Sequence, residues 1–320
     1  MLRSIQPATL VGYQRQWRKF HTWFHRKPGS YSSITVDVVS KYLLFLFHNP
    51  DSSGGLRSGS YLNSVRSALS FFVQYSIPSL GYDVTITRLF SFFYKCRPSF
   101  PHYCVTWDVG QVLRFLAGWH PPSSLNTKLL TLKTVSLIAL TSCDRAQTLH
   151  ALSVEKVHIS ANGVVFVVPT VLKTSKRGKP AQTVECVSWD EDSLDVCAYV
   201  HAYINRTFKF RWRAVQRGLE KPTQFFLSHR TGRPICRGTI SRWIREVLAR
   251  AGIDMALFGP GSTRGASASA ASRRGASASQ IMKAGNWTNL GTFQRFYKHT
   301  VDNTPVGRLI LAEASVSDTC

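Results

Sequence analysis

Arginine, lysine and tyrosine are the residues of this chain whose positions could support chemistry on a polyanion. The sequence contains no GxxxxGK[ST] loop, no HExxH motif and no CxxC pair. Its 17 acidic residues are scattered, which disfavours two-metal nuclease chemistry because that chemistry needs several inward-facing carboxylates. Tyrosine can act as a covalent nucleophile, and arginine can hold phosphate oxygens and stabilise the extra charge of a transition state. These residue types would suffice for metal-free transfer at a phosphodiester.

The composition indicates a folded protein with a polyanionic partner. Forty Lys and Arg against 17 Asp and Glu give a formal net charge of +23, and nucleic acid is the commonest partner for such an excess. Hydrophobic residues make up 44% of the chain, enough for real cores. No apolar run approaches the length of a membrane span. The seven cysteines are odd in number and widely spaced, which favours a reducing compartment over a disulfide framework.

Three short segments, spread over about 155 residues, contain the candidate residues. The first arginine box is Thr141-Ser-Cys-Asp-Arg145-Ala-Gln-Thr-Leu149. The second is Gly261-Ser-Thr-Arg264-Gly-Ala-Ser, and the terminal box is Ala284-Gly-Asn-Trp287 followed by Phe293-Gln-Arg-Phe-Tyr297. In order, spacing and context the three boxes resemble those of the tyrosine recombinases, the phage-integrase-like family. Trp287 and the Phe-x-x-Phe-Tyr ending are closest to the recombinases of DIRS- and Ngaro-type retrotransposons.

The resemblance implies a role for each residue. Tyr297 would attack the scissile phosphate, form a 3′-phosphotyrosyl link and release a 5′-hydroxyl, while Arg145 and Arg264 would hold the phosphate. Lys173, on a β-hairpin, would be the general acid toward the leaving oxygen. Trp287 would donate its indole N–H to the phosphate or pack behind Tyr297. The family needs neither a cofactor nor a metal ion for this reaction.

Structural explanations for the same residues remain open. Tyr297 and Trp287 could be core aromatics. Arg145 follows an apolar run, and it could be the buried half of a salt bridge. Lys173 shares its turn with three other cations, Lys176, Arg177 and Lys179, so that the choice of lysine is open, and the whole group could be a solvated hairpin or a nuclear-localisation run.

A repeated hexapeptide complicates the choice of the second arginine. The sequence Arg-Gly-Ala-Ser-Ala-Ser begins at Arg264 and again at Arg274. The Ser-Thr-Arg-Gly context favours Arg264. A flexible linker is one interpretation of the repeat. The other is a tightly packed helix, because alanine is the best helix former.

The chain departs from the family at one position. Gly261 stands where the second box usually has histidine, and no histidine lies within thirty residues before it. That histidine would bind the phosphate or help to manage the tyrosine proton, so its loss could cost orders of magnitude in rate. Gly259-Pro-Gly261 also predicts a flexible turn that could require a positive φ.

The expected fold is mainly α with a small antiparallel β-sheet. Residues 1–97 are expected to form a helical SAM-like core-binding domain that contacts DNA, and residues 103–312 the tyrosine recombinase catalytic domain, together making a two-domain clamp. Strands are expected between Lys156 and Cys186. Helices are expected from a Thr9 cap to Phe24 and over Val36–His48, Tyr61–Tyr75, Thr85–Tyr94, Val109–Gly118, Leu125–Cys143, Leu194–Phe208, Arg237–Ala251, Ala266–Ala284 and Leu290–Tyr297.

The expected function is site-specific recombination or integration of DNA by a mobile-element-derived enzyme. Its partner would be double-stranded DNA, and it would assemble as a homo-oligomer, a tetramer on paired sites, with Leu309-Ile-Leu311 in a tail that docks on a neighbour. We expect no membrane and no small-molecule substrate. The location would be the nucleus, or the cytoplasm if the source is a prokaryote. Two alternatives stay open: a catalytically impaired DNA-binding protein of the same fold, and a nicking enzyme resembling type IB topoisomerases.

Overall fold

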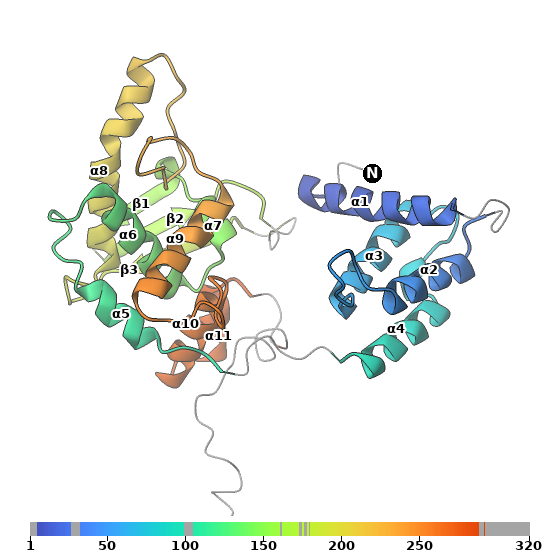
Figure 1. Cartoon of the computed structure of the whole chain (residues 1–320). Helices are drawn as coiled ribbons and strands as arrows, with labels where there is room; N and C mark the ends of the chain where they lie inside the picture. The colour runs from blue at the N-terminus through green and yellow to red at the C-terminus, as the bar shows by residue number, and fades with distance from the viewer. Residues whose placement is uncertain are drawn as a thin grey trace, which may run out of the picture. The chain divides into compact units, whose positions relative to one another are not determined.

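The chain folds into two compact units, Met1–Pro101 and His102–Cys320 (Figure 1). The computed structural model describes residues 5–26, 33–98, 105–160, 162–172, 175, 178, 180–287 and 291. No helix among these residues has the length and apolar character needed to cross a membrane.

The N-terminal unit is helical. Its four α-helices are α1 (Pro7–Phe24), α2 (Val36–His48), α3 (Gly59–Phe72) and α4 (Val84–Cys96), with a short 3-10 turn at Leu80–Tyr82. The Thr35 side chain caps α2 as its sequence suggests, by accepting a hydrogen bond from the Val38 N–H. The predicted Thr9 cap of α1 is wrong. The helix begins at Pro7, whose fixed φ and missing N–H suit the first turn.

Aromatic rings form much of the core of this unit. The ring of Phe20 meets that of Tyr42 edge-on at 5.1 Å between centroids, and Phe47 stacks on Phe93 at 4.4 Å. The Arg97 guanidinium lies 3.8 Å from the Phe47 ring centroid and donates a hydrogen bond of 2.8 Å to the Phe47 carbonyl. This contact ties the end of α4 to α2.

In the part of the chain described here, the C-terminal unit combines seven α-helices with one small sheet that packs on α6 and α8. The helices are α5 (Val109–Ala117), α6 (Thr127–Ser142), α7 (Ala146–His150), α8 (Val196–Gln216), α9 (Arg237–Arg250), α10 (Ser262–Arg273) and α11 (Ala278–Ala284). The strands β1 (Val157–Ser160), β2 (Gly163–Val167) and β3 (Thr183–Val187) pair antiparallel in the order β1-β2-β3. The mainly α fold with a small antiparallel sheet is thereby confirmed.

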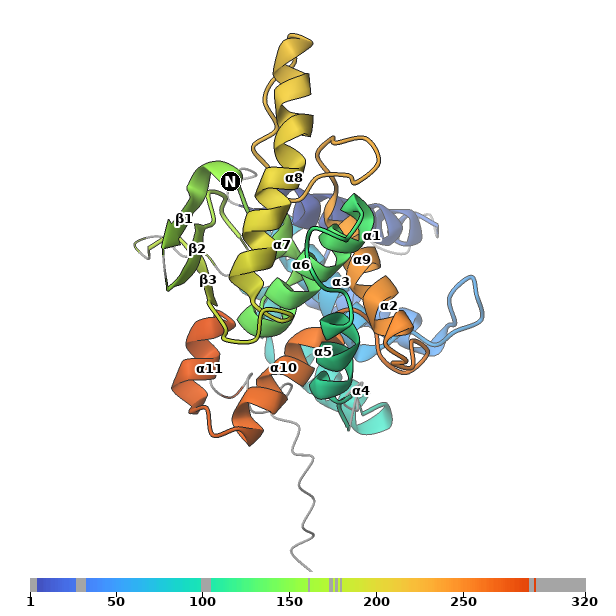
Figure 2. The same ribbon diagram turned by 90° about the vertical axis from the view of Figure 1, so that its left-hand side faces the viewer.

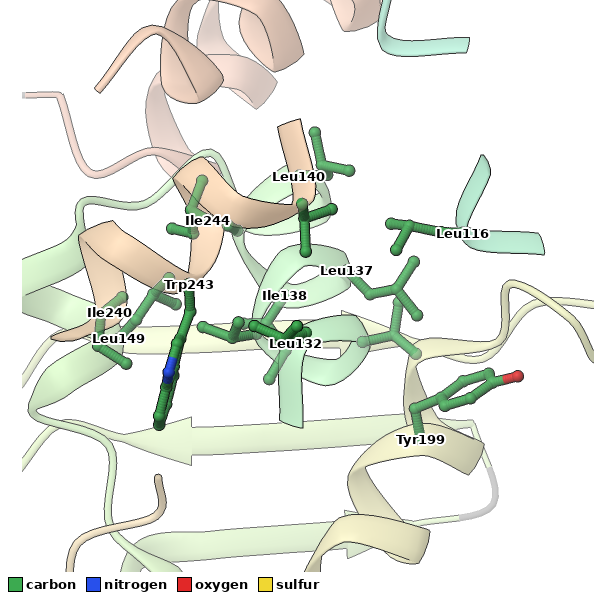
Figure 3. Close-up of a cluster of buried hydrophobic side chains, with 14 of the residues drawn as sticks. Leu116, Leu132, Leu137, Ile138, Leu140, Leu149, Tyr199, Ile240, Trp243 and Ile244 are labelled. Atoms are coloured by element: carbon green, nitrogen blue, oxygen red, sulfur yellow. The ribbon is translucent and has the colours of Figure 1, made fainter. Parts of the chain in front are cut away.

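Helix α6 is the centre of this unit. It contacts α8, α9, α10 and β3, and apolar or small residues cover it almost all round, as expected of a fully buried helix. Figure 3 shows side chains of α6 packed between those of α9, α7, α5 and α8. The labelled ones are Leu132, Leu137, Ile138 and Leu140 of α6, with Leu116, Leu149, Tyr199, Ile240, Trp243 and Ile244 around them.

A buried lysine in the first half of α6 fixes this helix to its surroundings. The Lys133 ammonium donates to the carbonyl oxygens of Leu116, Trp119 and Ser193, each at 2.7 Å, and to the Tyr199 hydroxyl at 2.8 Å. Burial lowers the pKa of Lys133 to about 8, so the amine still carries its proton at neutral pH. One charged group thus joins α5, α6 and the loop that leads into α8.

Two predicted helix boundaries are wrong. The helix expected over Ala266–Ala284 is two helices, α10 and α11, separated by a turn in which Gly275 has a φ of +88°. Helix α8 extends to Gln216, two turns beyond the predicted Phe208, and its far end projects from the body of the unit in both views (Figures 1 and 2). Helix α7 was not anticipated, and the helix expected at Leu290–Tyr297 lies outside the described residues apart from residue 291.

The Lys133→Met substitution should lower the free energy of unfolding by about 3 kcal/mol or more, because three buried carbonyls would lose a charged donor. Urea denaturation measures the change. The matched control is Lys128→Met on the same helix, which breaks only a partly exposed ion pair with Glu246 and should cost about 1 kcal/mol at most. Equal losses in the two variants would contradict a structural role for the buried ammonium.

Candidate active site

The first two boxes and the described part of the terminal box, Ala284 to Trp287, meet at one place in the C-terminal unit. Cys143 of the first box, Ala268 in the helix of the second box, and Trp287 of the terminal box pack together with Ile281 in a small buried cluster. Burial raises the pKa of the Cys143 thiol to about 11, so this cysteine stays neutral. Segments that are more than a hundred residues apart in sequence are therefore in direct contact.

Arg264 is a buried cation at the centre of this arrangement. Only 4% of the residue is exposed. Its Nη2 donates a hydrogen bond of 2.6 Å to the Gly285 carbonyl, and its guanidinium carbon lies 3.8 Å from the centroid of the Trp287 ring. An arginine held by a carbonyl and an aromatic face has few orientations left, which suits a group that must meet a phosphate in a fixed geometry.

The turn that carries Trp287 depends on a residue without a side chain. A Cβ atom at Gly285 would overlap the indole ring of Trp287. The next residue, Asn286, has a left-handed backbone with a φ of +54°, a conformation that asparagine tolerates better than most residues. This tight turn brings the indole back over Arg264.

The first arginine box places two opposite charges side by side, one buried and one exposed. Cys143 ends α6 with a φ of +54°, and Asp144 after it is 5% exposed. Gln182, just before β3, donates a hydrogen bond of 3.0 Å to Asp144 Oδ1. Arg145 is exposed and begins α7 as its N-cap residue. The alternative in which Arg145 is the buried half of a salt bridge does not hold, because the buried position belongs to Asp144.

Burial also sets the charge state of Asp144. It raises the pKa of the carboxyl to about 6, against the lowering effects of Arg264, of the Thr148 and Asn286 side chains, and of Arg145. The carboxyl is therefore mostly ionised at neutral pH and sits between two arginines. Sequence reasoning missed it. Its position directly before Arg145, at the end of a long apolar helix, was the available signal.

The repeated hexapeptide adopts two different structures. The first copy, from Arg264, is buried within α10. The second copy begins at Arg274, the C-cap residue of the same helix, and Arg273 and Arg274 are exposed. The linker interpretation is wrong for the first copy, and only Arg264 of the three arginines reaches Trp287 in the described structure.

Gly261 has an ordinary backbone. Its φ and ψ are −70° and −18°, and it is the N-cap residue of α10. A Cβ atom there would meet no other heavy atom within 4 Å. Residues 260 and 261 form a turn, as the Gly-Pro-Gly sequence suggested, but Gly261 does not have a positive φ. A side chain at Gly261 would lie one helical turn before Arg264.

Other candidate residues lie outside the described part of the chain. They are Tyr297, Lys173, Lys176, Arg177, Lys179 and the tail with Leu309-Ile-Leu311. Lys173 falls in the segment that joins the antiparallel strands β2 and β3. Among the residues that the structure describes, no group of three or more His, Cys, Asp or Glu side chains is placed to hold a metal ion.

The N-terminal unit carries a basic groove of its own. It has a volume of about 920 Å³ and lies against α1, α2 and the loop between α2 and α3. Arg18, Lys19, Arg26 and Arg57 line it, and Asp51 is the single acidic residue among its lining residues. Such a groove has the charge to contact a phosphate backbone.

Comparison with known proteins agrees with this arrangement. The family model described as "Phage integrase family" matches residues 110–303, and the chain belongs to this family, whose members are tyrosine recombinases. No curated protein matches the chain.

Solved structures show the same fold at low identity. The XerH site-specific recombinase bound to difH substrate in a pre-cleavage complex has a TM-score of 0.58 and 14% identity, covering 99% of this chain and 82% of that one. The Tn1549 transposon integrase in complex with circular intermediate DNA has a TM-score of 0.57 and 14% identity, covering 95% and 94%. A lambda integrase tetramer bound to a Holliday junction has a TM-score of 0.53 and 14% identity, covering 92% and 73%.

The Asp144→Asn substitution should change how stability depends on pH. The unfolded carboxyl has a pKa near 3.8 and the folded one near 6, so the folded state binds more protons in this window and wild-type stability falls as pH rises through it. The variant does not titrate there. Its stability relative to wild type should therefore increase by roughly 2 kcal/mol between about pH 4 and pH 7.

Urea denaturation across this pH range measures the difference in stability. Asp108→Asn is the control, because its pH dependence should have the opposite sign. The pKa of Asp108 is lowered, chiefly by the Gly110 backbone N–H, so ionisation stabilises the fold there. The relative stability of that variant should fall as pH rises. A pH-independent difference for Asp144→Asn would show that its carboxyl titrates alike in both states.

Proposed function

We propose that this protein is a site-specific DNA recombinase that cleaves and rejoins DNA through a 3′-phosphotyrosyl intermediate on Tyr297. The observation that carries the proposal is the convergence of the described parts of the three boxes, in which Arg264 packs on Trp287 and interacts with the Asp144 carboxylate. Arg145 and Arg264 would hold the non-bridging oxygens, as paired guanidinium groups do for phosphates. Trp287 would support Arg264 and the nucleophile.

The steps of the reaction balance without a cofactor. The Tyr297 hydroxyl loses its proton to solvent as its oxygen displaces the 5′-oxygen of the DNA, so one phosphoester bond forms as another breaks. The leaving oxygen takes a proton from a general acid, which solvent then reprotonates. Lys173 is our candidate for that acid, since it lies on the β2–β3 connection and has cationic neighbours in sequence that favour its neutral form. Rejoining is the reverse attack by a 5′-hydroxyl.

The partner we propose is double-stranded DNA, bound by several copies of the protein. The net charge of +23 and the basic groove of the N-terminal unit support binding to phosphates, which should weaken steeply with salt. A tetramer on paired sites would match the assembly named for lambda integrase on a Holliday junction. We also propose a mobile-element origin, in line with the transposon integrase among the structural neighbours. The DIRS/Ngaro type and action in the nucleus are proposed from Trp287 and the Phe-x-x-Phe-Tyr ending alone.

The Tyr297→Phe variant should form no covalent adduct with nicked suicide DNA substrates, yet bind DNA nearly as wild type does, because only the hydroxyl is lost. Denaturing electrophoresis detects the adduct, and a DNA-binding titration is the control. The wild-type adduct should also form in excess EDTA. An adduct with the Phe variant would exclude Tyr297 as nucleophile, and cleavage that returns only with Mg²⁺ would contradict the metal-free mechanism.

The Gly261→His variant should form the adduct faster, by about a hundredfold if the imidazole reaches the phosphate, because one preorganised donor is worth on the order of 3 kcal/mol. The backbone and the open space at Gly261 accept a side chain without strain. Gly261→Leu, which adds a side chain of similar size without a hydrogen-bond donor, is the matched control and should not gain rate. DNA affinity should change little in either variant.

A catalytically impaired DNA-binding protein is the second candidate function, and Gly261 is the observation that favours it. If wild type and Gly261→His both bind DNA and neither forms an adduct, this alternative replaces the first. A nicking enzyme resembling type IB topoisomerases would form the adduct and relax supercoiled DNA, but it would not exchange strands between two duplexes.

A further inference from the structure

The projecting end of α8 presents an apolar stripe that no described residue covers. Phe208, Trp212 and Val215 are 62%, 54% and 47% exposed. They are spaced four and three residues apart, so at about 100° per residue they fall on one side of the helix. The rings of Phe208 and Trp212 stack at 6.4 Å with 13° between their planes. Leu219, just beyond the helix, is 60% exposed.

The stripe is distinct from the side of α8 that packs on the domain. The core side carries Tyr203, Thr207 and Arg211, all buried. Arg211 donates to the carbonyls of Gln224 and Phe225 at 2.8 Å, which holds the distal turns of the helix in place. The stripe is therefore exposed on a helix that the contacts of its core side hold in place.

A third side of the same helix is basic. None of the 21 residues of α8 is acidic. Lys209, Arg213 and Arg217 are exposed, and helical geometry places them next to the stripe on the side away from the core. The exposed end of α8 thus combines large apolar side chains with a row of uncompensated cations.

We propose that the Phe208–Trp212–Val215 stripe of α8 docks an acidic amphipathic helix of another protein. An apolar face on that helix would cover the stripe, as in other helix-to-helix recognition, and its flanking carboxylates would face Lys209 and Arg213. A second copy of this chain fits poorly, because an isologous contact would set the same cations against each other. DNA fits poorly too, since duplex DNA offers no apolar face for three adjacent apolar side chains.

The position of the stripe keeps it clear of the candidate active site. In both views the projecting end of α8 lies at the opposite end of the C-terminal unit from α10 and α11 (Figures 1 and 2). A docked partner could recruit the protein without covering Arg264. The proposal therefore does not depend on whether the chain is catalytically active.

The test uses the full chain and a fluorescent model peptide of about 20 residues, which is long enough to form a helix. The peptide has leucines spaced three and four residues apart on one face and glutamates on both sides of that face. Fluorescence anisotropy should show binding to wild type. Phe208→Ser/Trp212→Ser should weaken it by about tenfold or more, as expected for aromatic anchors. Trp189→Ser, which removes an equally exposed ring elsewhere, should leave the affinity unchanged. Thermal melts check that each variant is folded.

A charge-reversal pair tests the basic side. Lys209→Glu/Arg213→Glu should weaken binding by about threefold or more, whereas Arg242→Glu/Arg245→Glu, a pair of exposed cations on α9, should not. Equal binding of a peptide of the same composition in scrambled order would overturn the proposal, because attraction would then need no apolar face.

Two further outcomes would also overturn it. A wild-type oligomer that dissociates in Phe208→Ser/Trp212→Ser, seen by sedimentation velocity, would assign the stripe to a second copy. A loss of duplex-DNA affinity in the same variant would assign it to DNA. DNA affinity and adduct formation are separate readouts, so failure here is distinguishable from failure of the recombinase proposal.

Discussion

The contact between Arg264 and the Gly285–Trp287 turn is the interaction on which the candidate site depends. A buried guanidinium is costly unless its environment compensates the charge. Here the compensation comes from the Gly285 carbonyl, the π face of Trp287 and the nearby Asp144 carboxylate. The first two groups belong to the turn after α11, and Asp144 belongs to the segment that follows α6. The charge of Arg264 therefore couples the end of α6, the start of α10 and the turn after α11.

That coupling explains why α6 is so completely buried. The residues after its last turn must present Asp144 inward and Arg145 outward, and the left-handed backbone at Cys143 makes this reversal. If α6 rotated by a fraction of a turn, the inward position of Asp144 and the outward position of Arg145 would be lost. Packing of α6 by α8, α9, α10 and β3, with Lys133 pinning its first half, removes that freedom.

How far the sequence predicts the structure depends on which forces act locally. Helices with a clear apolar periodicity, such as α2 and α9, were predicted within about a residue. The three strands lie within one residue of the Lys156–Cys186 segment in which they were expected, because their β-branched runs are distinctive. The repeated hexapeptide was not. Identical residues are helical and buried from Arg264, whereas the copy from Arg274 forms a turn and then the exposed start of α11. The first copy differs because it packs against α6 and α11. Local sequence cannot supply that difference.

The same limit applies to the candidate site. The arginines and Trp287 were found because their order and spacing resemble a family. Asp144 was not, since its importance arises from burial beside Arg264, and a charged pair in sequence does not reveal which member turns inward. Gly261 illustrates the opposite case. Its residue type suggested a positive φ, yet the backbone of Gly261 is ordinary, and the space that a Cβ atom would occupy is open. The missing imidazole therefore removes one hydrogen-bond donor without disturbing Arg264. Binding to DNA, which sums many phosphate contacts, is expected to tolerate that loss far better than transition-state stabilisation, which depends on a few donors in fixed places.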